Sequence, residues 1–171
     1  CCTAMNTPPR KSCFAPVVDP ATRVLILGSL PGDASLAAQQ YYAHPQNQFW
    51  RLLGAVLGEP LAEQPYPQRL ATMQGHGVGL WDVIAAAQRH GSLDSNIREQ
   101  QHNDLAQLIA SLPRLRLVAF NGQTAGRRQR QIAALGKTSL ILPSSSPAHT
   151  LAYAQKLQQW LALRSALQPD H

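Results

Sequence analysis

Four short apolar runs recur along the chain, and three of them end in glycine, proline or small polar residues. The first, VLIL at 24–27, leads into GSLPGD, which is typical of a buried parallel strand entering a loop. The second is GVGLWDVI at 77–84, and the third is RLRLVAFNG at 114–122. The fourth, TSLILPSSSPAHT at 138–150, changes from apolar to small polar residues. Each run predicts one strand.

Segments with helical periodicity separate and follow these runs. Apolar residues at three- and four-residue spacing predict a helix over 46–57. The other predicted helices are 103–112 with Asn103 as its N-cap, 123–135 closed by Gly136, and about 151–167.

Alternating strands and helices predict an α/β fold, with three α/β/α layers around a central, mainly parallel four-stranded sheet. Residues 1–20 contain four prolines and little periodicity, which indicates an irregular N-terminal arm before a single domain at 21–168. Ligands bind beyond the carboxyl ends of strands in such sheets. The loops GSLPGD, FNG and PSSSPAHT should therefore meet at one site.

Charge adds a clue about the partner. The chain has 44% hydrophobic and 14% charged residues, which excludes a disordered protein, and its net charge is +6. No Asp or Glu occurs from Leu105 to Pro169, and a basic half of this kind attracts polyanions such as DNA. The basic residues of this half are Arg114, Arg116, Arg127, Arg128, Arg130, Lys137, Lys156 and Arg164.

Several features of the sequence argue against particular classes of protein. Cys1, Cys2 and Cys13 are too few for an iron–sulfur cluster and too uneven for a disulfide framework, so neither a metal cluster nor a cofactor is expected. No dinucleotide or nucleoside-triphosphate glycine motif follows any strand. The apolar runs are too short for a membrane span, and no secretory signal pattern opens the sequence. A cytoplasmic, nucleoid-associated protein is therefore expected.

The segment YYAHPQNQFW at 41–50 holds four of the ten aromatic residues of the chain. Pro45 disfavours helix at the preceding residue, so Asn47 should lie in the first helical turn. A carboxamide there can donate and accept, which suits the orientation of a water nucleophile. Tyr42 precedes the helix on a loop, where its ring can stack on a flat base.

The loops after the third and fourth runs carry further polar groups. Ser144–Ser146 and the N–H groups of a following helix favour phosphate, although one serine would suffice as an N-cap. His149 suits a cap or the core equally well. Asn121 is either a turn residue or a reader of a base edge.

The loop GSLPGD allows a close backbone approach at Gly28 and Gly32 and is stiffened by Pro31. Glycine and proline also end many strands for structural reasons alone. Asp33 and Asp82 are carboxylates that can lie near a bound sugar or serve only the fold.

Taken in order, G-x-x-P-G at Gly28–Gly32, the Tyr41–Tyr42 pair, H-P-x-N-x-F-W at His44–Trp50, FNG and SSSPA resemble the uracil-DNA glycosylase superfamily. The similarity is to its hypoxanthine-DNA glycosylase branch (family six), related to the mismatch-specific uracil/thymine enzymes, and spans about Arg23 to Leu163. It implies a monofunctional, monomeric DNA glycosylase of base-excision repair, acting on DNA with deaminated bases. The flipped-out base would be hypoxanthine or, alternatively, uracil.

The resemblance also implies roles. Asn47 is the expected catalytic residue, because Leu30 occupies the position of the catalytic asparagine of the mismatch-specific relatives. Tyr42 would stack on the base and Asn121 would read its edge. The expected base-binding residues are Gly28, Ser29, Pro31, Gly32, Tyr42 and Asn121. The residues expected to contact the DNA backbone are Ser144, Ser145, Ser146, His149, Arg127 and Arg128.

Two alternatives stay open. Leu30 leaves room for a non-catalytic nucleic-acid-binding module on the same fold. A small-nucleotide or ester hydrolase could use Ser144–Ser146 with His149, although the sequence lacks the G-x-S-x-G elbow. No lysine lies in these loops, so a Schiff-base lyase step is not expected.

Overall fold

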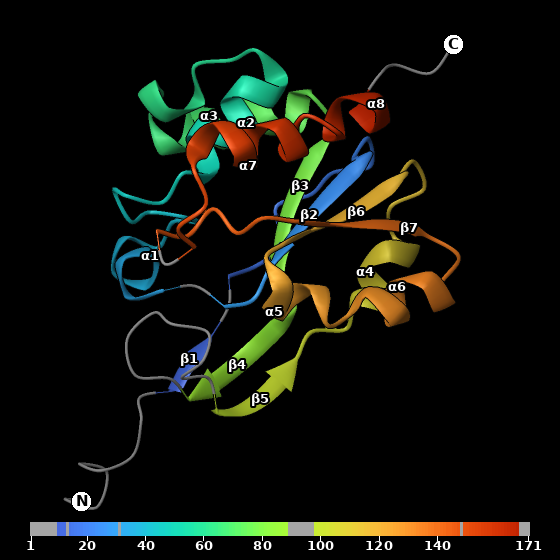
Figure 1. The fold of residues 1–171 in the computed structure, drawn as a ribbon. Coiled ribbons are helices and arrows are strands. Elements are labelled where there is room, and N and C mark those ends of the chain that lie inside the picture. The colour runs from blue at the N-terminus through green and yellow to red at the C-terminus, as the bar shows by residue number, and fades with distance from the viewer. Residues whose placement is uncertain (1–9, 13, 31, 89–97, 148, 168–171) are drawn as a thin grey trace, which may run out of the picture.

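A four-stranded, entirely parallel sheet with strand order β3-β2-β6-β7 forms the centre of the protein (Figure 1). The structure, a computed structural model, describes residues 10–12, 14–30, 32–88, 98–147 and 149–167. The predicted fold class is confirmed. The strands are β2 (Val24–Gly28), β3 (Val78–Asp82), β6 (Leu117–Asn121) and β7 (Thr138–Leu142).

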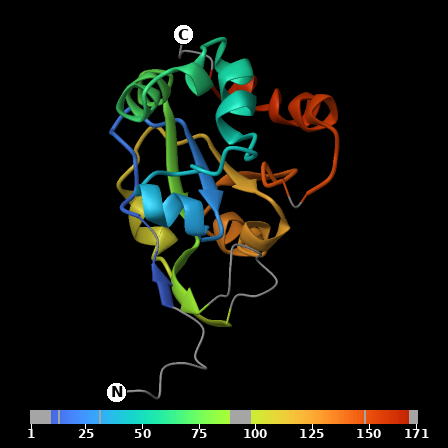
Figure 2. The same ribbon diagram turned by 90° about the vertical axis from the view of Figure 1, so that its left-hand side faces the viewer.

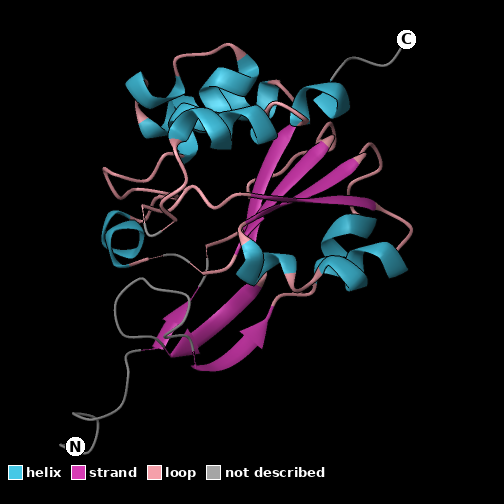
Figure 3. Ribbon diagram, in the orientation of Figure 1, coloured by secondary structure: helices cyan, strands magenta, loops and turns pink. Residues whose placement is uncertain are grey.

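Helices cover both faces of this sheet and complete the three layers (Figures 1 and 3). None of the helices in the described ranges is long and apolar enough to cross a membrane. One face packs against α2 (Phe49–Leu57), α3 (Tyr66–Gly75), α7 (Tyr153–Trp160) and α8 (Leu163–Leu167). The other packs against α4 (Leu105–Ala110), α5 (Gln123–Gly126) and α6 (Gln129–Ala134). The remaining helices are α1 (Asp33–Ala38) and a short 3-10 helix, η2 (Leu61–Glu63).

A second, antiparallel sheet has the order β1-β4-β5 and lies at the lower end of the molecule in Figures 1 and 2. Its strands are β1 (Arg10–Ser12), β4 (Ile84–Gln88) and β5 (Arg98–His102). The prediction that residues 1–20 are irregular is wrong for β1, since a three-residue polar strand carries no apolar signal. Val17 also pairs with Leu80, with backbone hydrogen bonds of 2.9 and 3.0 Å.

Side-chain hydrogen bonds to the backbone accompany two corrected helix starts. The helix expected from residue 46 begins at Phe49 with Gln48 as its N-cap, and Asn47 Oδ1 accepts the Phe49 N–H at 2.9 Å in a turn just before the helix. The cap of α4 is Asp104, whereas Asn103 donates its amide to the Asp82 carbonyl oxygen at 2.6 Å. The segments 123–135 and 151–167 each form two helices where one was predicted.

Gly54 in α2 leaves no room for a side chain. A Cβ at this position would lie 2.6 Å from the backbone oxygen of Glu59. Alanine gains about 1 kcal/mol in helix propensity, but the clash is with backbone that cannot rotate away. We therefore expect Gly54→Ala to lower the free energy of unfolding by about 1–3 kcal/mol, as measured by urea denaturation.

Gly75 in α3 is the matched control. A Cβ there meets no atom within 4 Å. Gly75→Ala should raise the free energy of unfolding by about 0.5–1 kcal/mol, because only the conformational term changes. An equal gain at both glycines would contradict tight packing at Gly54.

Candidate active site

A pocket of about 690 Å³ lies at the carboxyl end of the parallel sheet. This is the edge where open parallel sheets bind ligands, and the volume is in the range of small-molecule sites. Asp82 lines the pocket although the sequence left its role open, and Asp33 is exposed outside the lining. The predicted residues that line the pocket are Gly28, Ser29, Gly32, Tyr42, Asn47, Asn121, Ser144, Ser145, Ser146 and His149.

Two of the predicted site residues that the structure describes, Arg127 and Arg128, do not line the pocket. Arg127 is exposed at the end of α5, and Arg128 is partly buried beside it. Pro31 lies outside the described residues. The two arginines are therefore placed for a contact outside the pocket.

Strand register aligns polar side chains at the pocket floor. Gly28 pairs with Asp82 on one side, and Asn121 follows directly after the Leu27–Phe120 pair on the other. Side chains alternate along strands, so positions 28, 82 and 121 face the same layer as α2 and α7. Asp82 and Asn121 thus flank the glycine, with Cα atoms about 10 Å apart across two strand spacings.

The absence of a side chain at Gly28 keeps this floor intact. A Cβ would lie 2.7 Å from Asp82 Oδ1 and 2.8 Å from the Tyr42 hydroxyl oxygen. Both oxygens therefore occupy the space over the strand end that any other residue would fill. Asp82 is 3% exposed, so its carboxyl group lies deep in the site.

Tyr42 forms part of an aromatic wall. Its ring stacks on Phe49 with centroids 3.9 Å apart and planes 15° apart, and Phe49 packs edge-on against Trp50 and Trp160. Tyr42 also has φ 55°, a left-handed conformation that is uncommon for a bulky residue. Phe49 covers one face of the Tyr42 ring, and Tyr42 also lines the pocket.

Hydrogen bonds fix the position of Asn47 just before the N-terminus of α2. Its backbone N–H donates to the His44 carbonyl at 2.9 Å, and its Oδ1 accepts the Phe49 N–H at 2.9 Å. The Nδ1 atom of His44 accepts the Gln46 N–H at 3.1 Å, which fixes the preceding turn. A carboxamide oxygen has two lone pairs, so a second acceptor position and the NH₂ group remain to serve the pocket.

The carboxamide of Asn121 is bound at both ends by Ser145. Asn121 Oδ1 accepts the Ser145 N–H at 2.9 Å, and Asn121 Nδ2 donates to Ser145 Oγ at 2.9 Å. Ser145 is 0% exposed, and its carbonyl oxygen accepts the Gln48 N–H at 3.0 Å. Ser145 therefore presents no group to a DNA backbone, which narrows the predicted serine contacts to Ser144 and Ser146.

Lys156 lies inside the protein rather than on a basic surface. It is 1% exposed, and its Nζ donates to the Ser146 carbonyl oxygen at 3.3 Å. Burial lowers its pKa below the ordinary lysine value. Its position four residues before buried Trp160 is the sequence signal that could have revealed this, because both lie on one helix face.

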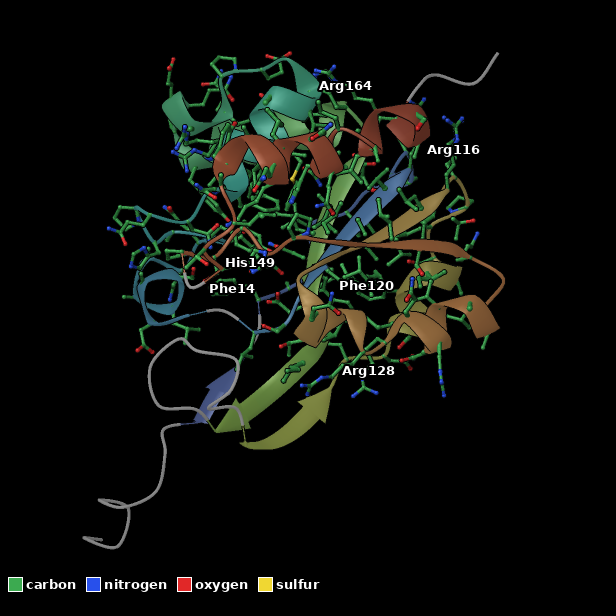
Figure 4. The ribbon with its side chains drawn as sticks, viewed as in Figure 1. Phe14, Arg116, Phe120, Arg128, His149 and Arg164 are labelled. Atoms are coloured by element: carbon green, nitrogen blue, oxygen red, sulfur yellow. The ribbon has the colours of Figure 1, made fainter. Side chains whose placement is uncertain are left out.

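Two arginines of the basic half donate hydrogen bonds to carbonyl oxygens of helices. Arg164 donates to the carbonyl oxygens of Val56 and Ala55 at 3.0 and 2.9 Å, and Arg116 donates to that of Ala166 at 3.3 Å. Figure 4 shows Arg116 and Arg164 at the end of the molecule away from His149. Only some of the cationic side chains of the basic half are therefore available to contact a polyanion.

Comparison with known proteins identifies the family. A model of the uracil DNA glycosylase superfamily matches residues 15–167. The chain belongs to this superfamily. The sequence resemblance is therefore confirmed. Within the described residues no group of three or more His, Cys, Asp or Glu could hold a metal ion.

Named relatives come from two archaea. A hypoxanthine DNA glycosylase of Methanosarcina acetivorans is 42% identical over 150 residues, which cover 88% of this chain and 95% of that protein. One of Methanosarcina barkeri is 42% identical over 151 residues, with 88% and 96% covered. A solution NMR structure of a candidate uracil DNA glycosylase from M. acetivorans superposes with a TM-score of 0.86 at 40% identity. It covers 94% of this chain and 100% of its own.

Lys156 should make stability depend on alkaline pH. Its pKa is lowered in the folded state, so between that value and the ordinary 10.5 the unfolded chain binds more protons than the folded chain. The free energy of unfolding contributed by this group therefore rises with pH through that window. Lys156→Met should remove the rise, as measured by urea denaturation from pH 7 to 10.5.

Gln155→Met, at the exposed neighbouring position, is the control, because no titratable group changes. Its stability difference from the wild type should stay constant with pH. If the difference for Lys156→Met is also constant, burial does not disfavour the charged lysine.

Proposed function

We propose that the protein is a DNA glycosylase that hydrolyses the N-glycosidic bond of hypoxanthine, and of uracil as a second base, flipped out of DNA. The pocket itself is the observation that supports the proposal. Around the carboxyl end of β2 it brings together the ring of Tyr42, the buried carboxylate of Asp82 and two carboxamides held by hydrogen bonds, those of Asn47 and Asn121. Relatives named hypoxanthine DNA glycosylase support the choice of base.

Deamination changes the hydrogen bonding of a base edge in a way that suits this pocket. It converts an amino group into a carbonyl acceptor and the neighbouring ring nitrogen from an acceptor into an N–H donor. Asp82 accepts this ring N–H, since a carboxylate has about four lone-pair positions. Asn121 donates to the carbonyl, and Tyr42 stacks on the ring. Adenine would place a lone pair against the carboxylate and is rejected.

Hydrolysis then breaks the C1′–N bond and joins a water oxygen to C1′. The bonding electron pair leaves with the base, and the sugar passes through an oxocarbenium-like state. Asn47 orients the water through its remaining hydrogen-bonding positions. An amide takes no proton at neutral pH, so the water loses its proton to solvent after attack on the cation, and the departed base anion takes up one proton, which leaves the free base and an abasic sugar. Leu30, 7% exposed, offers no polar group for this step.

The DNA backbone would lie across the pocket mouth. Ser144 and Ser146 line the mouth from the loop after β7, and exposed His149 follows them. Arg127 and Arg128 add phosphate contacts from the end of α5. The proposal includes a monomer acting on nucleoid DNA.

The alternatives receive less support from the geometry. Ser145 is sealed from solvent, and its N–H, carbonyl oxygen and hydroxyl oxygen each take part in a hydrogen bond, which disfavours the central serine as the nucleophile of an ester hydrolase. A non-catalytic module binds DNA without releasing base. Chromatography of free base from an inosine-containing duplex separates that module from a glycosylase.

Replacement of Asn47 should stop base release without loss of DNA binding. We expect Asn47→Ala to lower single-turnover hypoxanthine release by at least about 100-fold, the scale of one lost positioning interaction. The Kd for the duplex, measured by fluorescence anisotropy, should change less than about threefold. The variant also loses the hydrogen bond that Asn47 Oδ1 accepts from the Phe49 N–H, at about 1 kcal/mol of stability.

Asn47→Ser separates these two effects. Serine retains a capping oxygen, so the free energy of unfolding should return close to the wild-type value while release stays low. Release near the wild-type rate by either variant would remove Asn47 from the reaction.

Asp82→Asn should weaken discrimination against adenine. An amide can turn either its oxygen or its NH₂ group to the ring nitrogen, whereas a carboxylate only accepts. We expect slower release of hypoxanthine and at least about a tenfold lower ratio of release from inosine over release from 2′-deoxynebularine, whose ring nitrogen is an acceptor.

Asp33→Asn is the control for this experiment, because Asp33 is exposed on α1 outside the pocket. It should keep both rates. An unchanged ratio in Asp82→Asn would show that the carboxylate does not contact the ring N–H.

A further inference from the structure

The Ser145–Asn121 pair restricts what Asn121 can offer to a base. A backbone N–H only donates, so the contact with Ser145 N identifies the bound end of the amide as Oδ1 and the other as Nδ2. Both hydrogen bonds use the same outer edge of the carboxamide. One N–H and one oxygen lone pair remain, and they point to opposite sides of the amide. A flat base can therefore take one of them but not both.

The neighbouring carboxylate of Asp82 determines which of the two remaining groups of Asn121, the N–H or the oxygen lone pair, contacts the base. Asp82 flanks Gly28 from β3 and is an acceptor, so it complements the ring N–H of a deaminated base. The adjacent base carbonyl then needs a donor, and from β6 that donor is the second N–H of Asn121. The two strands thus supply one acceptor and one donor.

We propose that Ser145 is a positioning residue, whose buried hydroxyl holds the Asn121 carboxamide with its remaining N–H aimed at the carbonyl oxygen of the deaminated base. The inference rests on the proposed function. The backbone of Ser145 also binds the Gln48 N–H beside Asn47, so one loop residue sets the spacing between the base-contacting and water-orienting amides. Substitution of the side chain removes only its contact with Asn121.

Ser145→Ala tests this role, because the buried site accepts a smaller side chain and the amide end facing it loses its acceptor. Single-turnover release of hypoxanthine should fall about tenfold, with the Kd for DNA unchanged within about twofold. The ratio of release from inosine over 2′-deoxynebularine, which lacks the carbonyl, should fall by a similar factor. A purely structural role would slow both substrates alike and overturn the proposal.

A double-mutant cycle with Asn121→Ala shows whether Ser145 acts through Asn121. In the Asn121→Ala background, Ser145→Ala should change the release rate less than about twofold. An equal loss in both backgrounds, or no loss in the wild-type background, overturns the proposal. Ser165→Ala on α8, where the hydroxyl donates to the Ala162 carbonyl oxygen at 3.1 Å, is the matched control and should keep full release.

The contact between Ser145 and Asn121 can also be tested by a measurement that does not depend on catalysis. Hydrogen exchange of the Asn121 side-chain NH₂, followed by NMR, should be slow in the wild type and faster in Ser145→Ala. If Ser145→Ala fails to fold, Ser145→Cys, which retains a weak acceptor, replaces it in the cycle. A wild type that releases no base contradicts the proposed function. Equal exchange rates in active, folded proteins contradict the positioning role alone.

Discussion

The pocket depends on the missing side chain of Gly28. This glycine ends the central strand β2, and the two oxygens nearest to its absent Cβ belong to Asp82 and Tyr42. Because β2 has parallel neighbours on both sides, the space above it is bordered by Asp82 on β3 and Asn121 on β6. Any larger residue would push these groups apart and lose the close approach of a ligand to the sheet edge. The function of the fold thus rests on a steric constraint at one residue.

Sequence periodicity predicted the layers but not the contacts that determine polar roles. The apolar runs identified the four strands of the parallel sheet, because strands at its centre bury both faces and leave an uninterrupted apolar signal, whereas the strands of the second sheet were not predicted. Asn103 and Asp104 are equally good caps in the sequence, and only the tertiary contact of Asn103 with Asp82 decides between them. Ser145 could not be distinguished from Ser144 and Ser146 in a row of three serines, because burial of one depends on a partner 24 residues away.

Buried polar groups join the loops of the site at a cost in stability. Burial lowers the pKa of Lys156, and Ser145 and Asp82 are almost completely buried. Such groups contribute little net stability compared with apolar side chains of similar size. Their value is geometric, because hydrogen bonds join the Ser144–Ser146 loop to Gln48 just before α2, to Asn121 on β6 and to Lys156 on α7. The loop is therefore fixed to the central sheet and to the helices on one of its faces.

Rigidity of this kind matters more for recognition than for bond breaking. In the proposed complex, a base that stacks on Tyr42 could slide in the plane of the ring, since stacking alone has little directional preference. Two hydrogen bonds of opposite polarity, from Asp82 and Asn121, would define one position in that plane. They do so only while the Asn121 amide cannot rotate, and the buried hydroxyl of Ser145 removes that freedom. In this proposal, discrimination between a base and its deaminated form depends on a serine that the base does not touch.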